Sequence, residues 1–141
     1  MSDDSVRGAP PAGYQTVSPY LLYEDADLAV AWLSGLGFAE RRTTTGAAGR
    51  THHEVVLGDD GLVMLGQMGP DFRSPRSLGI DPASMVHVYV ADVQALHERA
   101  VSAGAHVTDL EMSPAGDQRF TATDPEGQVW VFAQRVGEDV A

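Results

Sequence analysis

The residues of this sequence that could carry chemistry include two pairs in which a histidine lies two positions before another polar residue. His52 and Glu54 form one pair, and His87 and Tyr89 form the other. Residues two positions apart on an extended chain point to the same side, so both members of a pair can meet one ligand. An imidazole placed this way can act as a general acid–base group or as a hydrogen-bond partner. It can equally be a pocket-wall histidine with a satisfied ring, and residue types alone leave both readings open.

Several other residues could contact a ligand. Arg119 can bind an anionic group, or it can pair with one of the many surface acids. Tyr20 can stack on a flat ligand. Met64 and Met85 can provide a soft, adaptable apolar lining, or they can simply fill a core.

Composition removes several classes of function. The chain has no cysteine, which excludes a disulfide scaffold, a zinc–thiolate site and a cysteine nucleophile. Its 20 acids against 9 Lys and Arg give a formal net charge of -11, a surface that disfavours nucleic acid and anionic membranes as partners. No apolar run is long enough to span a bilayer, and the N-terminus lacks the apolar stretch of a signal peptide. We therefore expect a cytoplasmic protein.

The elements that must position these residues alternate strand and helix. An aromatic and aliphatic run at residues 17–23 predicts a strand, and Asp25 is a typical N-cap for the helix that follows. Two strands are predicted at residues 52–58 and 61–67, joined by an Asp-Asp-Gly turn that is typical of a hairpin. The region therefore predicts a strand, a helix, an extended piece that begins at Phe38, and a terminal hairpin.

The same order of elements returns downstream. A strand is predicted at residues 85–90, and a helix follows from Asp92. Strands at 118–123 and 128–134 flank an Asp-Pro-Glu-Gly turn, a sequence that suits a type I turn. One shift of 67 residues superimposes the caps and strand ends of the two regions. The equivalent pairs are Asp25 with Asp92, Gly37 with Gly104, and Gln67 with Gln134.

This offset predicts a duplicated βαβββ unit and therefore an α+β fold. The Gly-, Pro- and Ser-containing stretch between the two units has the composition of a linker. The expected organisation is a flexible N-terminal tail at 1–14, a first module at 15–68, a linker at 69–84, a second module at 85–136 and a C-terminal tail at 137–141.

The segments 52–59, 90–96 with 103–105, and 124–130 resemble the vicinal oxygen chelate superfamily of glyoxalases, bleomycin-resistance proteins and dioxygenases. The resemblance covers residues 15–136 and is strongest for the PhnB-like or bleomycin-resistance-like branch. It implies a sheet curled around a cavity, with helices on the convex face. It also implies a homodimer, because many members build their cavities from both chains.

The resemblance also indicates where a metal would be held. Metal-dependent members place one ligand, His or Glu, on the first and on the last strand of each module. The equivalent residues here are Ser18, Met64, Met85 and Val131. None of the four offers an imidazole or a carboxylate, the donors that divalent ions prefer. We therefore expect no metal and no other cofactor, with a displaced set of His52, Glu54 and His87 as the alternative.

Strand alternation completes the predicted site. Val86, Val88 and Val90 share one face of their strand, which suits packing against a helix, while the opposite face suits a pocket wall. The predicted ligand-binding residues are Ser18, Tyr20, Leu22, His52, Glu54, Met64, Met85, His87, Tyr89, Arg119 and Val131.

The favoured function is a metal-independent protein that sequesters or carries a small, partly aromatic ligand. The alternative is a glyoxalase-like enzyme of lyase, isomerase or dioxygenase type, acting through His and Glu as acid–base groups or through the displaced metal. A purely structural dimerisation module is a third reading. It leaves unexplained why one strand carries polar and aromatic groups opposite a uniform valine face.

Overall fold

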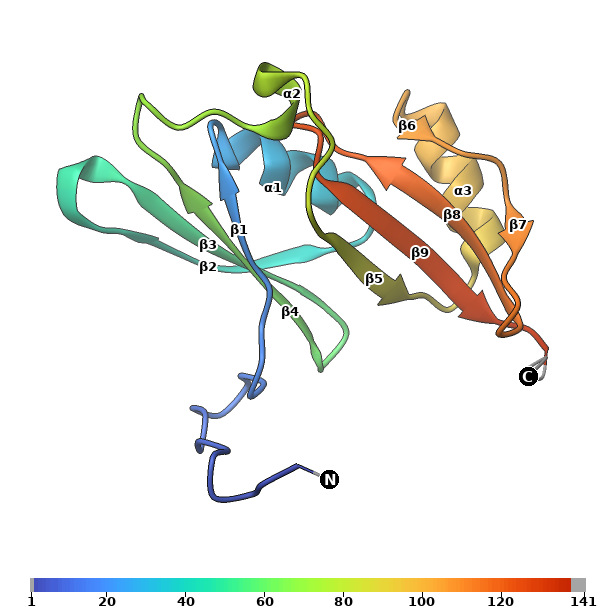
Figure 1. The fold of residues 1–141 in the computed structure, drawn as a ribbon, viewed down its shortest axis with the longest axis horizontal. Coiled ribbons are helices and arrows are strands. Elements are labelled where there is room, and N and C mark those ends of the chain that lie inside the picture. Colours follow the sequence, from blue (N-terminus) through green and yellow to red (C-terminus); the bar gives the residue numbers. More distant parts are fainter. Residues whose placement is uncertain (1, 138–141) are drawn as a thin grey trace.

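The computed structural model describes residues 2–137, which form two modules beside one another (Figure 1). Each module contains a mixed sheet and a ten-residue helix packed on it. Most of the predicted C-terminal tail, residues 138–141, lies outside the described residues. In chain order the elements are β1 (Tyr20–Tyr23), α1 (Ala26–Gly35), β2 (Ala39–Thr45), a 3-10 turn (Ala47–Gly49), β3 (Thr51–Leu57), β4 (Gly61–Gln67), α2 (Pro75–Leu78), β5 (Met85–Tyr89), α3 (Val93–Ser102), β6 (His106–Val107), β7 (Glu111–Met112), β8 (Asp117–Thr123) and β9 (Val129–Arg135).

The two sheets have the same topology. The first has the strand order β1-β4-β3-β2, with β1 parallel to β4 and the remaining pairs antiparallel. The second has the order β5-β9-β8-β6, with β5 parallel to β9, and β7 pairs separately with β8. The predicted α+β fold of two βαβββ modules is confirmed, although two short pieces, β6 and β7, replace the second strand of the second module.

The helices begin in the same way in both modules. Asp25 and Asp92 are the N-caps of α1 and α3, and each carboxylate accepts a hydrogen bond from the backbone N–H three residues on, at 3.1 and 3.0 Å. Gln67 and Gln134 accept one from the first backbone N–H of α1 and α3, at 2.8 and 3.0 Å. The repeat seen in the sequence is therefore a repeat of helix-capping chemistry.

The core lies between the helices and the sheets and is continuous across the two modules. Trp130, on β9, is fully buried. Its ring lies 6.2 Å from that of Trp32 on α1 and 5.9 Å from that of Phe38, both from the first module. Aromatic rings at these separations pack favourably beyond the area that they bury. One tryptophan thus joins the two modules into a single core.

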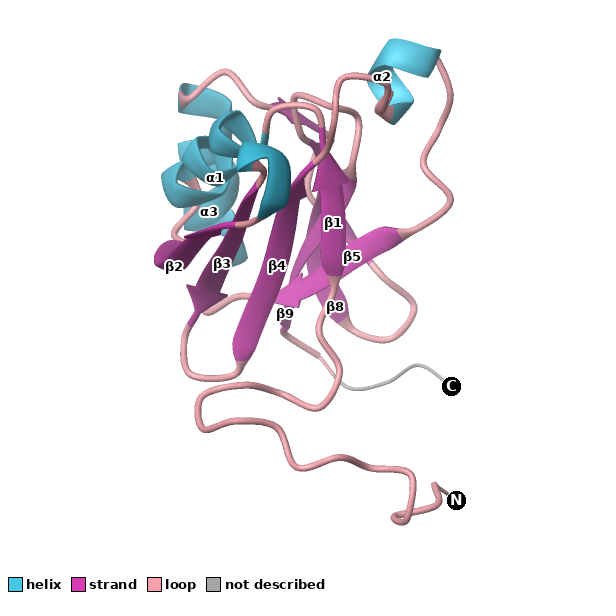
Figure 2. Cartoon of the chain, turned by 90° about the vertical axis from the view of Figure 1, so that its left-hand side faces the viewer, coloured by secondary structure: helices cyan, strands magenta, loops and turns pink. Residues whose placement is uncertain are grey.

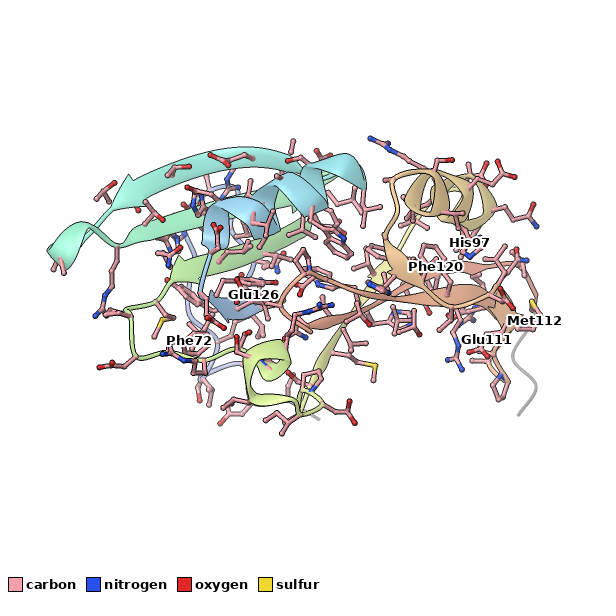
Figure 3. All side chains as sticks on the ribbon, turned by 90° about the horizontal axis from the view of Figure 1, so that it is seen from above. Phe72, His97, Glu111, Met112, Phe120 and Glu126 are labelled. Atoms are coloured by element: carbon pink, nitrogen blue, oxygen red, sulfur yellow. The ribbon has the colours of Figure 1, made fainter. Side chains whose placement is uncertain are left out.

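A buried polar network reinforces this junction. Tyr23 donates from its hydroxyl to Asp124 at 2.7 Å, and the Trp130 indole N–H donates to the same carboxylate oxygen at 3.2 Å. Glu126, at the meeting point of the modules (Figure 3), accepts from the backbone N–H groups of residues 24 and 25 at 2.7 and 2.8 Å. Burial raises the pKa of Glu126. Over the described residues, the two modules of one chain therefore pack against each other.

The segment predicted as a linker contains a short helix, α2, whose N-cap is Ser74. The carboxylate of Glu24 accepts hydrogen bonds from the Ser77 hydroxyl at 2.6 Å and from the Ser74 backbone N–H at 2.8 Å. These bonds lower the pKa of Glu24 to about 2. The segment is therefore attached to the end of β1, and the module boundaries stay as predictions. Within residues 2–137, no helix is long and apolar enough to cross a membrane.

Candidate functional site

Each sheet has one face packed against its helix and one face without helical cover, here called the open face. Figure 2 shows α1 and α3 on one side of the strands. On β1, Tyr23 is buried in the core, whereas Tyr20 and Leu22 are exposed, as alternation requires. Tyr20 pairs in register with Met64 on β4, and Met64 pairs with Glu54 on β3. Five of the predicted site residues, Tyr20, Leu22, His52, Glu54 and Met64, therefore share the open face of the first sheet.

The open face of the second sheet holds a second group. Met85, His87 and Tyr89 are the exposed residues of β5, while the valines between them face the core. His87 pairs in register with Val131 on β9, and Tyr89 lies two strands away from Arg119 on β8. The other five predicted residues, Met85, His87, Tyr89, Arg119 and Val131, therefore belong to this face.

Ser18 is the predicted site residue that lies outside the strands. The sequence predicts a strand at residues 17–23, but β1 begins at Tyr20. Pro19 has no N–H for the ladder, and only its carbonyl is used, as an acceptor for the Met64 N–H at 3.0 Å. Ser18 is thus half-buried just before the strand.

Glu54 is the centre of a polar network on the first open face. It is only 4% exposed, and its carboxylate accepts from the Tyr14 hydroxyl at 2.8 and 2.9 Å and from Arg41 at 2.9 Å. His52 places Nε2 3.3 Å from the other side of this carboxylate. The remaining ring nitrogen of His52 is 2.9 Å from the Tyr20 hydroxyl. The network runs from the buried acid to an exposed tyrosine.

The network determines the charge of Glu54. Burial raises the pKa of the Glu54 carboxyl, but the hydrogen bonds from Tyr14, Arg41 and His52 outweigh it, so the pKa lies below its ordinary value. The carboxylate is therefore ionised at neutral pH, and an arginine already balances its charge. This environment suits a group that orients its neighbours better than one that takes up a proton.

Tyr14 and Arg41 were missed by sequence reasoning. Tyr14 lies in the predicted tail, and Arg41 lies on β2, 13 residues before its partner Glu54. The segment around Tyr14 is attached to the first module at several points: Arg41 donates to the carbonyl of Gly13 at 2.6 Å and stacks over the Tyr14 ring at 4.4 Å. Gln15 exchanges two side-chain hydrogen bonds with the backbone of Leu62, at 2.8 and 3.1 Å. The sequence signal that could have indicated Tyr14 is its position as an isolated tyrosine within a polar, proline-rich stretch.

The second open face has a comparable acid–arginine–tyrosine group. Asp117 accepts from Arg135 Nε at 2.6 Å and from the Tyr89 hydroxyl at 2.9 Å. The hydrogen bond from Arg135 is the main reason that the pKa of Asp117 lies below its ordinary value, and burial opposes it. The ring of His87 lies 5.0 Å from that of Tyr89. Each face therefore presents an imidazole beside a phenol, with the nearby acid already paired.

The family model of the Glyoxalase/Bleomycin resistance protein/Dioxygenase superfamily matches residues 15–132. The chain belongs to this superfamily. An uncharacterized protein of Mycobacterium bovis is 33% identical over 129 residues, which is 86% of this chain and 84% of that protein. The crystal structure of TioX from a Micromonospora species is 28% identical, with a TM-score of 0.63 over 86% of this chain and 96% of that one. A bleomycin-binding protein complexed with bleomycin shares the fold, at 17% identity and a TM-score of 0.66 over 85% and 98% of the two chains.

The residues that the resemblance equates with the metal ligands of metal-dependent members do not fit an ion. They are a serine, two methionines and a valine, namely Ser18, Met64, Met85 and Val131. The alternative set is divided between the sheets, because His52 and Glu54 lie on β3 and His87 on β5. Within residues 2–137, no group of three or more His, Asp or Glu side chains is arranged to hold an ion.

Both open faces of this glyoxalase-like chain are accessible from outside. A hollow of about 320 Å³ lies between the edge of β5 and the first sheet, lined by His87, Tyr89, Val63 and Gln15 among others. Arg119 lies farther along the second sheet and is paired with Glu111 at 3.0 Å. In the chain without a ligand, Arg119 therefore forms an ion pair with a surface acid. Its contact with a ligand stays a prediction.

Proposed function

We propose that this member of the glyoxalase/bleomycin-resistance superfamily binds a small, partly aromatic molecule on its open faces and sequesters or carries it without bond chemistry. One observation carries the proposal: the side chains of Tyr20 and Tyr89 are 50% and 57% exposed, and each lies against an imidazole. Tyrosine rings held by a hydrogen bond at one end and open on one side are suited to stacking on a flat ligand.

The apolar surface around these rings supports the proposal. Leu22 and Met85 are also exposed on the open faces. Covering apolar surface contributes about 25 cal/mol per Å², so a flat ligand that covers several such side chains gains affinity without any charge pairing. Contiguous exposed apolar groups with a polar surround are typical of binding surfaces.

The acids on these faces favour binding over catalysis. A general base works best when its pKa lies near the working pH. The pKa values of Glu54 and Asp117 are both shifted downward, and each is paired with an arginine. We therefore assign both acids to the support of the neighbouring rings, and not to proton transfer.

One observation favours an enzyme as the second candidate. The side chain of His87 makes no hydrogen bond with any other residue of the described part of the chain, so its ring nitrogens are available to a substrate. Replacing His87 with Gln separates the two candidates. A binding protein retains ligand affinity to within a few-fold, whereas an enzyme loses turnover of its substrate, as followed by mass spectrometry.

We also propose that a second copy of the chain covers the open faces. Large apolar side chains that are half exposed on two sheets are expected to be buried by a partner or a ligand. Sedimentation of the purified protein tests this idea, with a dimer as the expected result and a monomer at all concentrations as the contrary one.

Binding is tested with bleomycin and a panel of planar antibiotics, by thermal shift and then by calorimetric titration. A ligand raises the melting temperature by mass action. Replacing Tyr20 or Tyr89 with Ala should weaken binding about tenfold, because stacking of an aromatic ring is worth about 1 kcal/mol or more. Replacing Val101 with Ala, an exposed change on α3, is the matched control. If the tyrosine variants and the control bind the ligand with equal affinity, the ligand does not bind on the open faces.

A further inference from the structure

Helix α1 is apolar around nearly its whole circumference. Its ten residues include only two polar ones, Asp27 and Ser34. One side of the helix is buried in the core, yet Leu28 is 48% exposed on another side, and Trp32 is only partly buried. A helix that is apolar on all sides is usually covered on all sides. The outer apolar side of α1 is therefore only partly covered by residues 2–137.

This side of α1 lines a groove of about 500 Å³, on the helix-covered side of the molecule and separate from the open faces. The opposite wall is formed by residues 103–106, after α3, and by residues 123–125, at the turn between β8 and β9. The volume lies within the range of small-molecule sites. The groove is therefore large enough for a ligand of one or two rings.

The second module provides an internal control for this composition. The shift of 67 residues aligns each groove residue of α1 with a residue of α3, and three of these four equivalents are polar. The pairs are Leu28 with Ala95, Ala31 with Glu98, Trp32 with Arg99, and Gly35 with Ser102. The same fold is thus built with a polar outer helix side, so the apolar side of α1 is not required by the architecture.

Gly35 keeps the groove open. Its φ angle is not positive, so the backbone does not require glycine there. A Cβ atom added at Gly35 would meet no atom within 4 Å apart from its chain neighbours and the backbone of its own helix, so crowding by other parts of the chain does not require glycine either. Glycine within a helix costs stability relative to alanine. Gly35 lines the groove at the last residue of α1, and the missing side chain leaves the groove wider there.

Two groups that can be cationic border the groove. Arg76 comes from α2 and His106 from β6. Neither side chain makes a hydrogen bond or ion pair with another residue of the described range 2–137, in a chain that has 20 acids for 9 Lys and Arg. A guanidinium without an acidic partner at the border of an apolar groove can pair with an anionic oxygen of a ligand.

We propose that this groove is a second binding site, for a small apolar carboxylate whose body lies against Trp32 and Leu28 and whose carboxylate meets Arg76. Arg76 can bind one carboxylate, and the apolar floor suits a ring or a short hydrocarbon. The carboxylate of Asp124 also lines the groove, but its oxygens already accept four hydrogen bonds from within the chain. The site is independent of the proposed function of the open faces.

The test uses 2-naphthoate as the probe and its neutral amide as the comparison, by calorimetry and by the NMR signal of the Trp32 indole N–H. We expect one molecule per chain, with the amide bound about tenfold more weakly, because a charge-assisted hydrogen bond is lost. R76Q should weaken naphthoate binding about tenfold and leave amide binding unchanged. Filling the groove with G35M, or with A31F as a second variant, should abolish both. The matched control is S102M, at the equivalent position of α3.

Several outcomes would overturn the proposal. They are absence of naphthoate binding at millimolar concentration, equal binding of acid and amide, and unchanged binding by both groove-filling variants. Loss of naphthoate binding in Y20A or Y89A instead would place the probe on the open faces. A dimer in sedimentation that G35M dissociates would make the groove an interface between copies of the chain.

Discussion

Glu54 illustrates how one residue organises the candidate site. Four side chains from four different segments meet at or beside its carboxylate, and three of them donate to it or lie within hydrogen-bonding reach. A buried carboxylate is tolerated only when hydrogen bonds and an opposite charge replace its water. The consequence is a fixed orientation for His52 and Tyr20, the two groups that a ligand would meet.

The stability that Glu54 provides should be lost in acid. The folded-state pKa of Glu54 is below its ordinary value of 4.5, so the contribution is complete above that value and disappears as the pH falls through the lower folded pKa. Replacing Glu54 with Gln should lower the free energy of unfolding at neutral pH by about 1–3 kcal/mol. It should also flatten the dependence of this free energy on pH below about 4.5, the ordinary pKa of the carboxyl. Urea denaturation at a series of pH values measures both effects.

The control for this experiment is Asp60→Asn, which changes an exposed carboxylate in the β3–β4 turn. It should leave both the stability and its pH dependence nearly unchanged. If the Glu54 variant keeps the wild-type slope, the acid sensitivity lies in another carboxyl, and Asp117, whose pKa is also lowered, is the first to examine.

At the scale of elements, the two helices begin alike, but their starts are not equally supported. Gln67 accepts from the first N–H of α1 and also donates to the carbonyls of Glu24 and Met68. Gln134 accepts from the first N–H of α3, with no other side-chain hydrogen bond among the described residues. One glutamine thus connects a strand, a helix and the start of the linker segment, while the other supports a helix start.

Truncating these glutamines should separate the two roles. Replacing Gln134 with Ala removes one hydrogen bond and should cost about 1 kcal/mol of unfolding free energy. Replacing Gln67 with Ala removes three and should cost about 2–3 kcal/mol by the same reasoning. Chemical denaturation of the two variants measures the difference, and each is the matched control of the other. Equal costs would mean that the two additional bonds of Gln67 contribute no net stability.

At the scale of the whole molecule, the two modules are joined by a buried core and a polar network. Asp124 is 1% exposed and accepts from Tyr23, from Trp130 and from the backbone N–H groups of Glu126 and Gln128. The Tyr23 side chain comes from the first module and the other donors from the second. This carboxylate therefore contributes both to a turn and to the contact between modules.

Replacing Asp124 with Asn should weaken the whole fold and not only the turn. An amide nitrogen has no lone pair to accept the bonds now made to one carboxylate oxygen, so buried donors are left without an acceptor. The expected cost is about 2–4 kcal/mol, with faster hydrogen exchange in both modules. The exposed change Asp109→Asn is the control. Faster exchange confined to the β8–β9 turn would show that Asp124 does not couple the modules.

Much of the fold was predictable because its signals are local. The N-caps Asp25 and Asp92 and the glycines after each helix, Gly37 and Gly104, depend on neighbours within a few residues. Both glycines have positive φ, a conformation that other residues rarely adopt. Strand alternation likewise indicated the open-face positions of Tyr20 and His87, whereas Ser18 lies outside the strands. The start of β1 was predicted too early because Pro19 cannot extend the ladder.

The partners of the site residues depended on the tertiary structure. Tyr14 is 40 residues from Glu54, and Tyr89 is 28 residues from Asp117, so no local pattern joins either pair. The sequence by itself determined the duplicated modules, the helix ends and the faces of the strands, because caps, turns and alternation act over short distances. Only the tertiary structure decided that the acids of both faces are paired with arginines, and that the two modules share one core, because burial and charge pairing depend on segments far apart in the chain.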